Sequence, residues 1–101
     1  MNNSVLVKEE AVVDGHLFVS YPGESNYSNF YFIVTTKGIK FEGNPDLNFS
    51  DLITVNLSPM ERILKLTTSL GTIKCVSPIA EMIEDLHKYI SQRHKDIHLK
   101  T

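Results

Sequence analysis

The chain has 101 residues, 42% of them hydrophobic and 22% charged, a composition typical of one globular domain. Ten Lys and Arg residues against twelve Asp and Glu residues give a net charge of −2, which argues against a general nucleic-acid-binding protein. No run approaches the ~20 apolar residues of a membrane helix, and a single cysteine, Cys75, excludes an internal disulfide. We therefore expect one cytoplasmic domain over residues 1–101.

A series of short β-strands separated by turn residues is predicted over residues 5–76. β-branched and apolar residues predict an edge strand over 5–13, and Asp14-Gly15 predicts a turn after it. Alternating apolar and polar residues predict a strand over 16–21, which a long loop over 22–29 follows. Further strands are predicted over residues 30–36, 39–42, 53–57, 62–68 and 72–76, while residues 47–51 follow a second loop and are assigned no element. One apolar face on each is typical of an antiparallel sandwich or barrel.

The hydrophobic period changes to that of a helix near residue 78. Ser77 is a good N-cap residue, and Pro78 suits the first helical position because its missing N–H has no partner to lose there. Apolar residues then recur at helical spacing and form one stripe: Ile79, Met82, Ile83, Leu86 and Ile90. No Gly or Pro ends the pattern. We predict a helix over residues 78–94, which covers the open end of the sheet, and a frayed tail over 95–101.

Six or seven antiparallel strands followed by one capping helix resemble the pleckstrin-homology (PH) superfold. Residues 14–19, 30–34 and 37–41 are similar to the opening three strands of PH domains, with a Gly-x-Leu start and an aromatic second strand. Residues 63–68 and 80–86 are similar to their last hairpin and helix. Residues 34–37 and 49–53 equally resemble the bacterial PH-like and GRAM-type domains. The resemblance implies a mainly β, PH-like barrel or sandwich with a C-terminal helix.

Two departures from the PH pattern bear on function. PH domains usually carry a Trp in the C-terminal helix, whereas this chain has none and places Met82 there; Met fills a similar apolar gap. Domains of the family that hold phosphoinositide headgroups use basic residues across the first two strands. Residues 16–32 contain no Lys or Arg and include Glu24. Because charge-assisted bonds to phosphate need Lys or Arg, the usual headgroup pocket is not expected here.

The sequence gives no sign of catalysis, of a cofactor or of a metal centre. His94 and His98 have the one-turn spacing of two helical metal ligands, but no third ligand stands at a suitable spacing, so we expect a polar helix end there. Cys75 shares a strand face with Ile73, which predicts a packed thiol and not a nucleophile. The adjacent acidic pairs point in different directions and form no acid–base dyad.

Two surfaces are candidates for binding. Tyr21, Tyr27 and Phe30 place aromatic rings in or beside the polar loop, as recognition loops do, although Tyr21 and Phe30 serve equally well to complete the core. The other candidate is a basic patch on outward strand faces, for which a solvated strand surface is the simpler interpretation. Its residues are Lys37, Lys40, Arg62, Lys65 and Lys74.

From these patterns we expect a non-catalytic PH-like module, a scaffold or adaptor that binds a protein partner or a second copy of itself. A PH-type barrel leaves a groove between its helix and an adjacent strand, where an exposed strand edge accepts an extended peptide. The missing basic cluster favours a protein over a lipid. The alternative is weak peripheral attachment to an anionic, phosphoinositide-containing membrane through the basic strand face.

Overall fold

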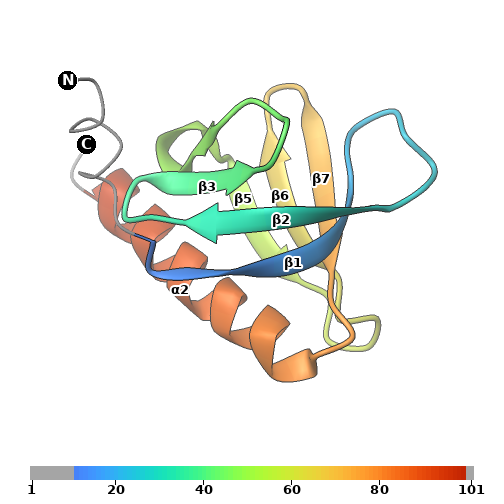
Figure 1. Cartoon of the computed structure of the whole chain (residues 1–101). Coiled ribbons are helices and arrows are strands. Elements are labelled where there is room, and N and C mark those ends of the chain that lie inside the picture. The colour runs from blue at the N-terminus through green and yellow to red at the C-terminus, as the bar shows by residue number, and fades with distance from the viewer. Residues whose placement is uncertain (1–10, 100–101) are drawn as a thin grey trace, which may run out of the picture.

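The computed structural model describes residues 11–99 and consists, within that range, of a curled antiparallel sheet and a C-terminal helix (Figure 1). The strands are β1 (Val13–Ser20), β2 (Ser28–Val34), β3 (Gly38–Phe41), β4 (Leu47–Asn48), β5 (Thr54–Leu57), β6 (Leu64–Thr68) and β7 (Gly71–Val76). A short 3-10 helix, η1 (Phe49–Asp51), follows β4, and the α-helix α2 (Ala80–Leu99) follows β7. No helix of the described residues is both long enough and apolar enough to cross a membrane.

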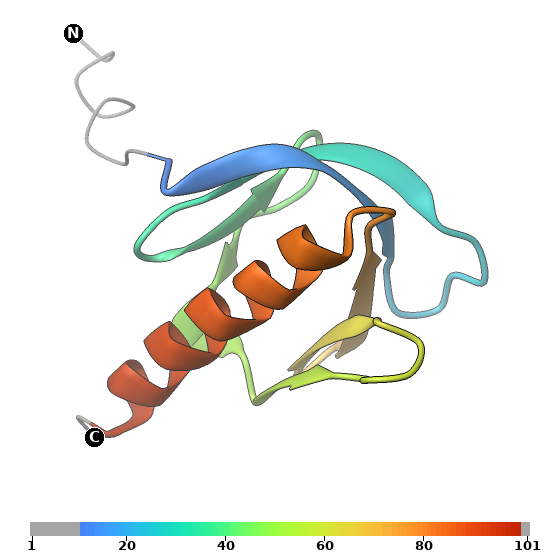
Figure 2. The ribbon, with the colours of Figure 1, turned by 90° about the horizontal axis from the view of Figure 1, so that it is seen from below.

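The strands form one sheet in the order β4-β3-β2-β1-β7-β6-β5, and every neighbouring pair is antiparallel. The sheet does not close, because β4 and β5 remain its two end strands. β1 pairs with β2 along Val13–Val19 but with β7 only over Phe18–Ser20. The sheet therefore folds over at β1 into two facing halves, and α2 lies across one open end between them (Figure 2).

The core lies between the two halves of the sheet and the helix. Strand residues alternate between core and surface, so that Leu17 and Val19 are fully buried while the intervening Phe18 is exposed. The helix contributes Ile83, Leu86 and Ile90 at helical spacing to the same core. Since burying one such side chain stabilises the fold by about 1.5–3 kcal/mol, the helix is an integral part of the domain. This confirms the predicted antiparallel sandwich with a capping helix.

The predicted turn at Asp14-Gly15 is wrong, because both residues lie inside β1 opposite Ile33 and Phe32. Asp14 faces outward, where its carboxylate Oδ2 accepts a hydrogen bond of 2.7 Å from the hydroxyl of Tyr31. Gly15 leaves room for the helix: a Cβ at this position would lie 3.3 Å from Cε of Met82. Close packing, rather than a turn, explains the glycine. The predicted strand over 5–13 lies outside the described residues, apart from its last three positions.

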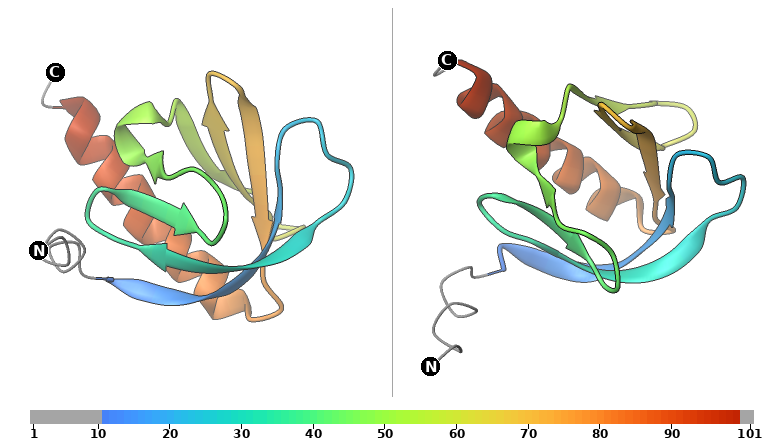
Figure 3. Two further views of the ribbon diagram at one scale, coloured as in Figure 1. Left: turned by 45° about the horizontal axis from the view of Figure 1, so that its top comes forward. Right: turned by 90° about the horizontal axis from the view of Figure 1, so that it is seen from above.

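Residues 47–51, for which the sequence pattern predicts no element, begin with the two residues of β4. After Asn48 the chain forms η1, which places Phe49 in the core. The ring of Phe49 packs edge-on against Tyr89 of α2, with the ring centroids 6.3 Å apart. A side chain that becomes fully buried at this position gains more by packing on the helix than by extending a terminal strand. This 3-10 turn links the two halves of the sheet beside α2, as two further views show (Figure 3).

The predicted end of the helix is also wrong, because α2 continues to Leu99 where a frayed tail was expected from residue 95. Two contacts hold this end. The imidazole Nε2 of His94 lies 2.9 Å from the backbone oxygen of Leu52, and Ile97 packs against the core. At the other end, the helix starts at Ala80, and Ser77 Oγ accepts the N–H of Ile79 at 3.0 Å. Residues 100–101 lie outside the described part.

Candidate functional site

A surface groove of about 390 Å³ lies between β5 and the C-terminal half of α2. Val55 contributes from β5, and the helix contributes the remaining lining residues: Ser91, His94, Lys95, His98 and Leu99. β5 is an end strand, so its outer edge pairs with no other strand of residues 11–99. The structure thus places a free strand edge beside a groove, which is the arrangement that accepts an extended peptide.

His94 fixes the helix wall of this groove. A backbone carbonyl only accepts hydrogen bonds, so Nε2 of His94 carries the proton that it donates to Leu52, 42 residues earlier in the chain. Leu52 is itself buried and joins η1 to β5. The His94 and His98 rings lie next to each other, with centroids 4.2 Å apart. The histidine pair is therefore part of a wall, and within the described residues no group of three His, Cys, Asp or Glu side chains can hold a metal ion.

The groove combines apolar groups with one cation, Lys95, and with polar side chains. None of its lining residues is acidic, whereas Lys95 and two histidines line it. Leu99 is 76% exposed at its end, and Ile53, which directly precedes β5, is 57% exposed. Exposed apolar side chains of this size beside a free strand edge are typical of an interaction surface.

Sequence reasoning predicted the type of this site but not its residues. The general expectation of a groove between the helix and a neighbouring strand is matched by the groove at β5. Lys95 and Leu99 were missed because the helix was expected to end at residue 94, and Ser91, inside the predicted helix, was not singled out. The usable signal was the i, i+4 repeat of Ser91 with Lys95 and of His94 with His98, which puts these side chains on one flank of a continued helix.

A second pocket, of about 420 Å³, lies at the end of the sheet away from α2, between the β1–β2, β3–β4 and β6–β7 connections. We refer to it as the loop-end pocket. Its walls are mostly apolar and include Tyr21, Leu47 and Ile73, and its charged lining residues are Asp46 and Asp51. No Lys or Arg lines it. An anionic headgroup would meet carboxylates here without a cation to bind it.

The three predicted aromatic residues do not form one surface. Tyr21 and Phe30 pack against the core and against Phe41, with ring centroids 6.2–6.5 Å apart in this trio. Burial raises the pKa of Tyr21 to about 12, and its hydroxyl has no hydrogen-bond partner within the described residues. Tyr27 lies separately in the β1–β2 loop and is 39% exposed. Of the three, Tyr27 has the most solvent-facing position.

The predicted basic residues are split between the two halves of the sheet. Lys65 and Lys74 are directly opposite each other on β6 and β7. Arg62 instead forms an ion pair of 3.0 Å with Glu84 of α2. Lys40 lies on β3, and three strands (β2, β1 and β7) lie between β3 and β6 in the sheet. The structure therefore brings together two of the five residues.

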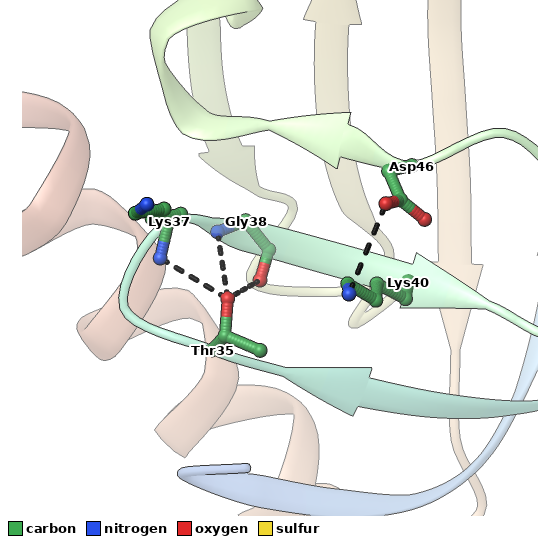
Figure 4. Close-up of polar contacts among 5 residues, drawn as sticks. All are labelled: Thr35, Lys37, Gly38, Lys40 and Asp46. Carbon is green, nitrogen blue, oxygen red and sulfur yellow. Dashed lines mark hydrogen bonds and ion pairs between the residues drawn. The ribbon is translucent and has the colours of Figure 1, made fainter. Parts of the chain in front are cut away.

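The other two basic residues are Lys37, in the β2–β3 turn, and Lys40, on β3 (Figure 4). Thr35 Oγ1 accepts hydrogen bonds from the backbone N–H groups of Lys37 and Gly38, at 3.1 and 3.2 Å, which fixes the turn. Lys40 forms an ion pair of 3.9 Å with Asp46 across the neighbouring connection. The charge of Lys40 is thus partly balanced within the domain.

Cys75 is fully buried, as its strand pattern predicted. Burial raises the pKa of its thiol to about 12, so the thiol stays protonated at neutral pH. A nucleophilic cysteine needs the opposite, a lowered pKa and access to substrate. The role of Cys75 is packing between β1 and β6, where it pairs with Val19 and Leu64.

Comparison with known proteins supports the fold and leaves the function open. No family model matches the chain, and no curated protein matches it. Among solved structures, the N-terminal PH domain of human ARAP2 aligns with a TM-score of 0.74 and 14% identity over 88% of this chain and 84% of that one. The C-terminal PH domain of human FGD3 (FYVE, RhoGEF and PH domain containing protein 3) aligns with a TM-score of 0.67 and 16% identity, over 83% of this chain and 88% of that one.

A third solved structure, a pleckstrin homology domain in solution, gives a TM-score of 0.68 at 16% identity over 88% of this chain and 89% of that one. Each likeness spans most of both chains. Identities this low carry no site residues across. The chain has a PH-like fold, as the sequence resemblance predicted.

Proposed function

We propose that the chain is a non-catalytic PH-like module that binds a protein partner by taking an extended segment along the outer edge of β5. PH-like domains commonly bind proteins or phosphoinositides and are generally non-catalytic. The observation that carries the proposal is the free edge of β5 beside the groove lined by α2. Main-chain hydrogen bonds to the edge supply affinity, and the groove accepts alternate side chains of the added strand.

The distribution of charge supports a protein ligand over a phosphoinositide. The loop-end pocket has carboxylates where a phosphate would need cations. Attachment to an anionic membrane has less support, because the basic residues are divided between β3 and the β6–β7 hairpin and two of them are already in ion pairs. We assign the module to a reducing compartment such as the cytoplasm, in keeping with its single buried thiol.

Filling the groove tests this proposal. Ser91→Trp places a large side chain in the groove, whereas Lys88→Trp changes an exposed position of the same helix that does not line it. Peptides selected from a random library by the wild-type chain should lose most of their affinity for Ser91→Trp and keep it for Lys88→Trp. Selected peptides that bind all three chains equally would refute the assignment of the site.

A second copy of the chain is one partner that fits this edge, because two β5 strands can pair antiparallel about a two-fold axis. Sedimentation of the wild-type chain and of Ser91→Trp measures this directly. Self-association predicts a dimer whose population rises with concentration and falls in the variant. If the wild-type chain is a monomer at all concentrations, self-association is ruled out and the partner is a different protein.

A further inference from the structure

The charges around the β5–α2 groove indicate the chemistry of its ligand. We propose that the segment bound along β5 is acidic, with Asp or Glu side chains that face the helix wall. This inference rests on the proposed function, since it names the partner class for the same groove. Lys95, His94 and His98 line that wall, and no carboxylate does.

Three carboxylates of α2 and η1 either bind another side chain of the domain or line a different pocket. Glu84, on the same helix, is bound by Arg62 at 3.0 Å. Asp96 Oδ1 accepts a hydrogen bond of 3.0 Å from Nε2 of Gln92, one turn earlier. Asp51 of η1 lines the loop-end pocket instead. A carboxylate from a ligand therefore enters a wall of cationic and polar groups and meets no acidic side chain that lines it.

The spacing of the wall matches an extended ligand. Positions one turn apart on a helix, such as His94 and His98 or Ser91 and Lys95, are ~6 Å apart along the axis. Side chains that point to the same face of an extended strand recur every ~7 Å. A segment that runs along the helix axis with acidic residues at alternate positions would present one carboxylate to each turn of the wall. The intervening side chains then face away from the helix.

The charge of the wider chain agrees with this direction. Residues 62–101 carry seven Lys and Arg against four Asp and Glu, whereas residues 1–61 carry three against eight. Within α2 the acidic residues Glu81, Glu84 and Asp85 lie in the first half, whereas the half that lines the groove, residues 88–99, carries three Lys and Arg against one Asp. Long-range attraction of an acidic segment toward this part is expected at low salt and falls as the Debye length shrinks.

Three labelled peptides test the inference by fluorescence anisotropy. The first alternates Glu with Val or Thr, and the others replace every Glu by Gln or by Lys. The Glu peptide should bind the wild-type chain at least ~5-fold tighter than the Gln peptide, as expected from one or two exposed charge pairs, and high salt should remove the difference. A preference for the Lys peptide, or none, would overturn the acidic assignment.

Two helix variants locate the effect. Lys95→Glu should reduce affinity for the Glu peptide by at least ~5-fold and improve affinity for the Lys peptide, because it reverses one charge of the wall. Lys88→Glu makes the same charge change at an exposed position outside the groove and should leave affinity within ~2-fold. Equal losses in both variants would mean that only net charge matters, which would contradict a specific wall.

The two proposals fail in different ways. Nuclear magnetic resonance shifts of the Thr54–Leu57 amides report whether any peptide adds to β5. If Gln and Glu peptides shift these amides with equal affinity, peptide binding at β5 stands and the acidic preference falls. If no peptide shifts them, the proposed function falls as well. If the shifts require a second copy and no peptide, the occupant is the chain itself and the acidic assignment is refuted.

Discussion

The two end strands of the sheet, β4 and β5, share a position in the topology but differ in their surroundings. β4 has two residues, and its neighbour Asp46 is tied to Lys40 beside the acidic loop-end pocket. β5 has four residues and lies beside a groove with cationic and apolar walls. A two-residue edge offers too few backbone groups to add a strand, whereas four residues support a short ladder. We therefore propose β5, and not β4, as the edge that accepts a partner.

The largest effect is expected from Gly38→Ala, which breaks the β4 side of the comparison. A Cβ at Gly38 would overlap the backbone oxygen of Leu47, so β4 must leave β3. We expect the free energy of unfolding to fall by about 3 kcal/mol, the upper part of the usual range for overpacking, because the overlap is with backbone atoms that cannot rotate away. Urea denaturation measures this, with the exposed Ser50→Ala as control. A loss below about 1 kcal/mol for Gly38→Ala would show that β4 is not fixed at this position.

The next effect concerns the β5 side, where His94→Ala removes the hydrogen bond to the Leu52 carbonyl. Because a partly buried carbonyl then loses its partner, we expect a loss of about 1–3 kcal/mol. Hydrogen exchange of the last turn of α2 should also become faster. Lys88→Ala is the matched exposed control on the same helix and should change stability by less than about 0.5 kcal/mol. Unchanged exchange in His94→Ala would mean that the helix end is held by packing alone.

A smaller effect is expected at the seam between the two halves, where Cys75 lies between β1 and β6. Burial raises the pKa of its thiol from 9.0 to about 12, so the unfolded chain loses this proton at a lower pH than the folded one. Stability should therefore fall as pH rises above 9, by up to about 1.4 kcal/mol for each pH unit. In Cys75→Ala the free energy of unfolding should fall less steeply with pH over this range, whatever the stability of the variant at pH 7. Equal slopes in both chains between pH 9 and 10 would contradict burial of the thiol.

The smallest effect is expected from the double variant Lys65→Glu, Lys74→Glu on the outward face of β6 and β7. Peptide binding at β5 should change less than in Lys95→Glu, because neither lysine lines the groove and Lys65, opposite Asn56 of β5, lies on the outward face where exposed charge pairs contribute little. Pelleting with anionic vesicles should be weak for the wild-type chain and change little. Strong pelleting that this variant abolishes would instead favour the membrane alternative over the protein partner.

The fold was predictable because its pattern repeats along the chain. Alternating residues such as Leu17 and Val19, and the helical stripe through Ile83, Leu86 and Ile90, each report one buried face. The errors occurred where a tertiary contact decides the local structure. Asp14-Gly15 has the sequence of a turn, but its pairing with Ile33 and Phe32 of β2 keeps it in a strand.

The candidate site was less predictable for the same physical reason. The end of α2 depends on a hydrogen bond between His94 and Leu52, residues 42 positions apart, which no local pattern reports. A helix stopped at residue 94 loses most of the groove wall, including Lys95 and His98. The residues predicted instead, such as Tyr21, are aromatic residues in a polar neighbourhood whose burial only the folded sheet reveals. Local pattern predicts the elements, whereas contacts between distant elements define the groove.

Hydrogen–deuterium exchange of the chain with and without saturating Glu-alternating peptide tests the central claim most directly. The account predicts slower exchange of the β5 amides, Thr54–Leu57, because the added strand pairs with their free edge. The loop over residues 21–27, beside the acidic loop-end pocket, should be unchanged. Protection confined to that loop, with β5 unaffected, would contradict the account.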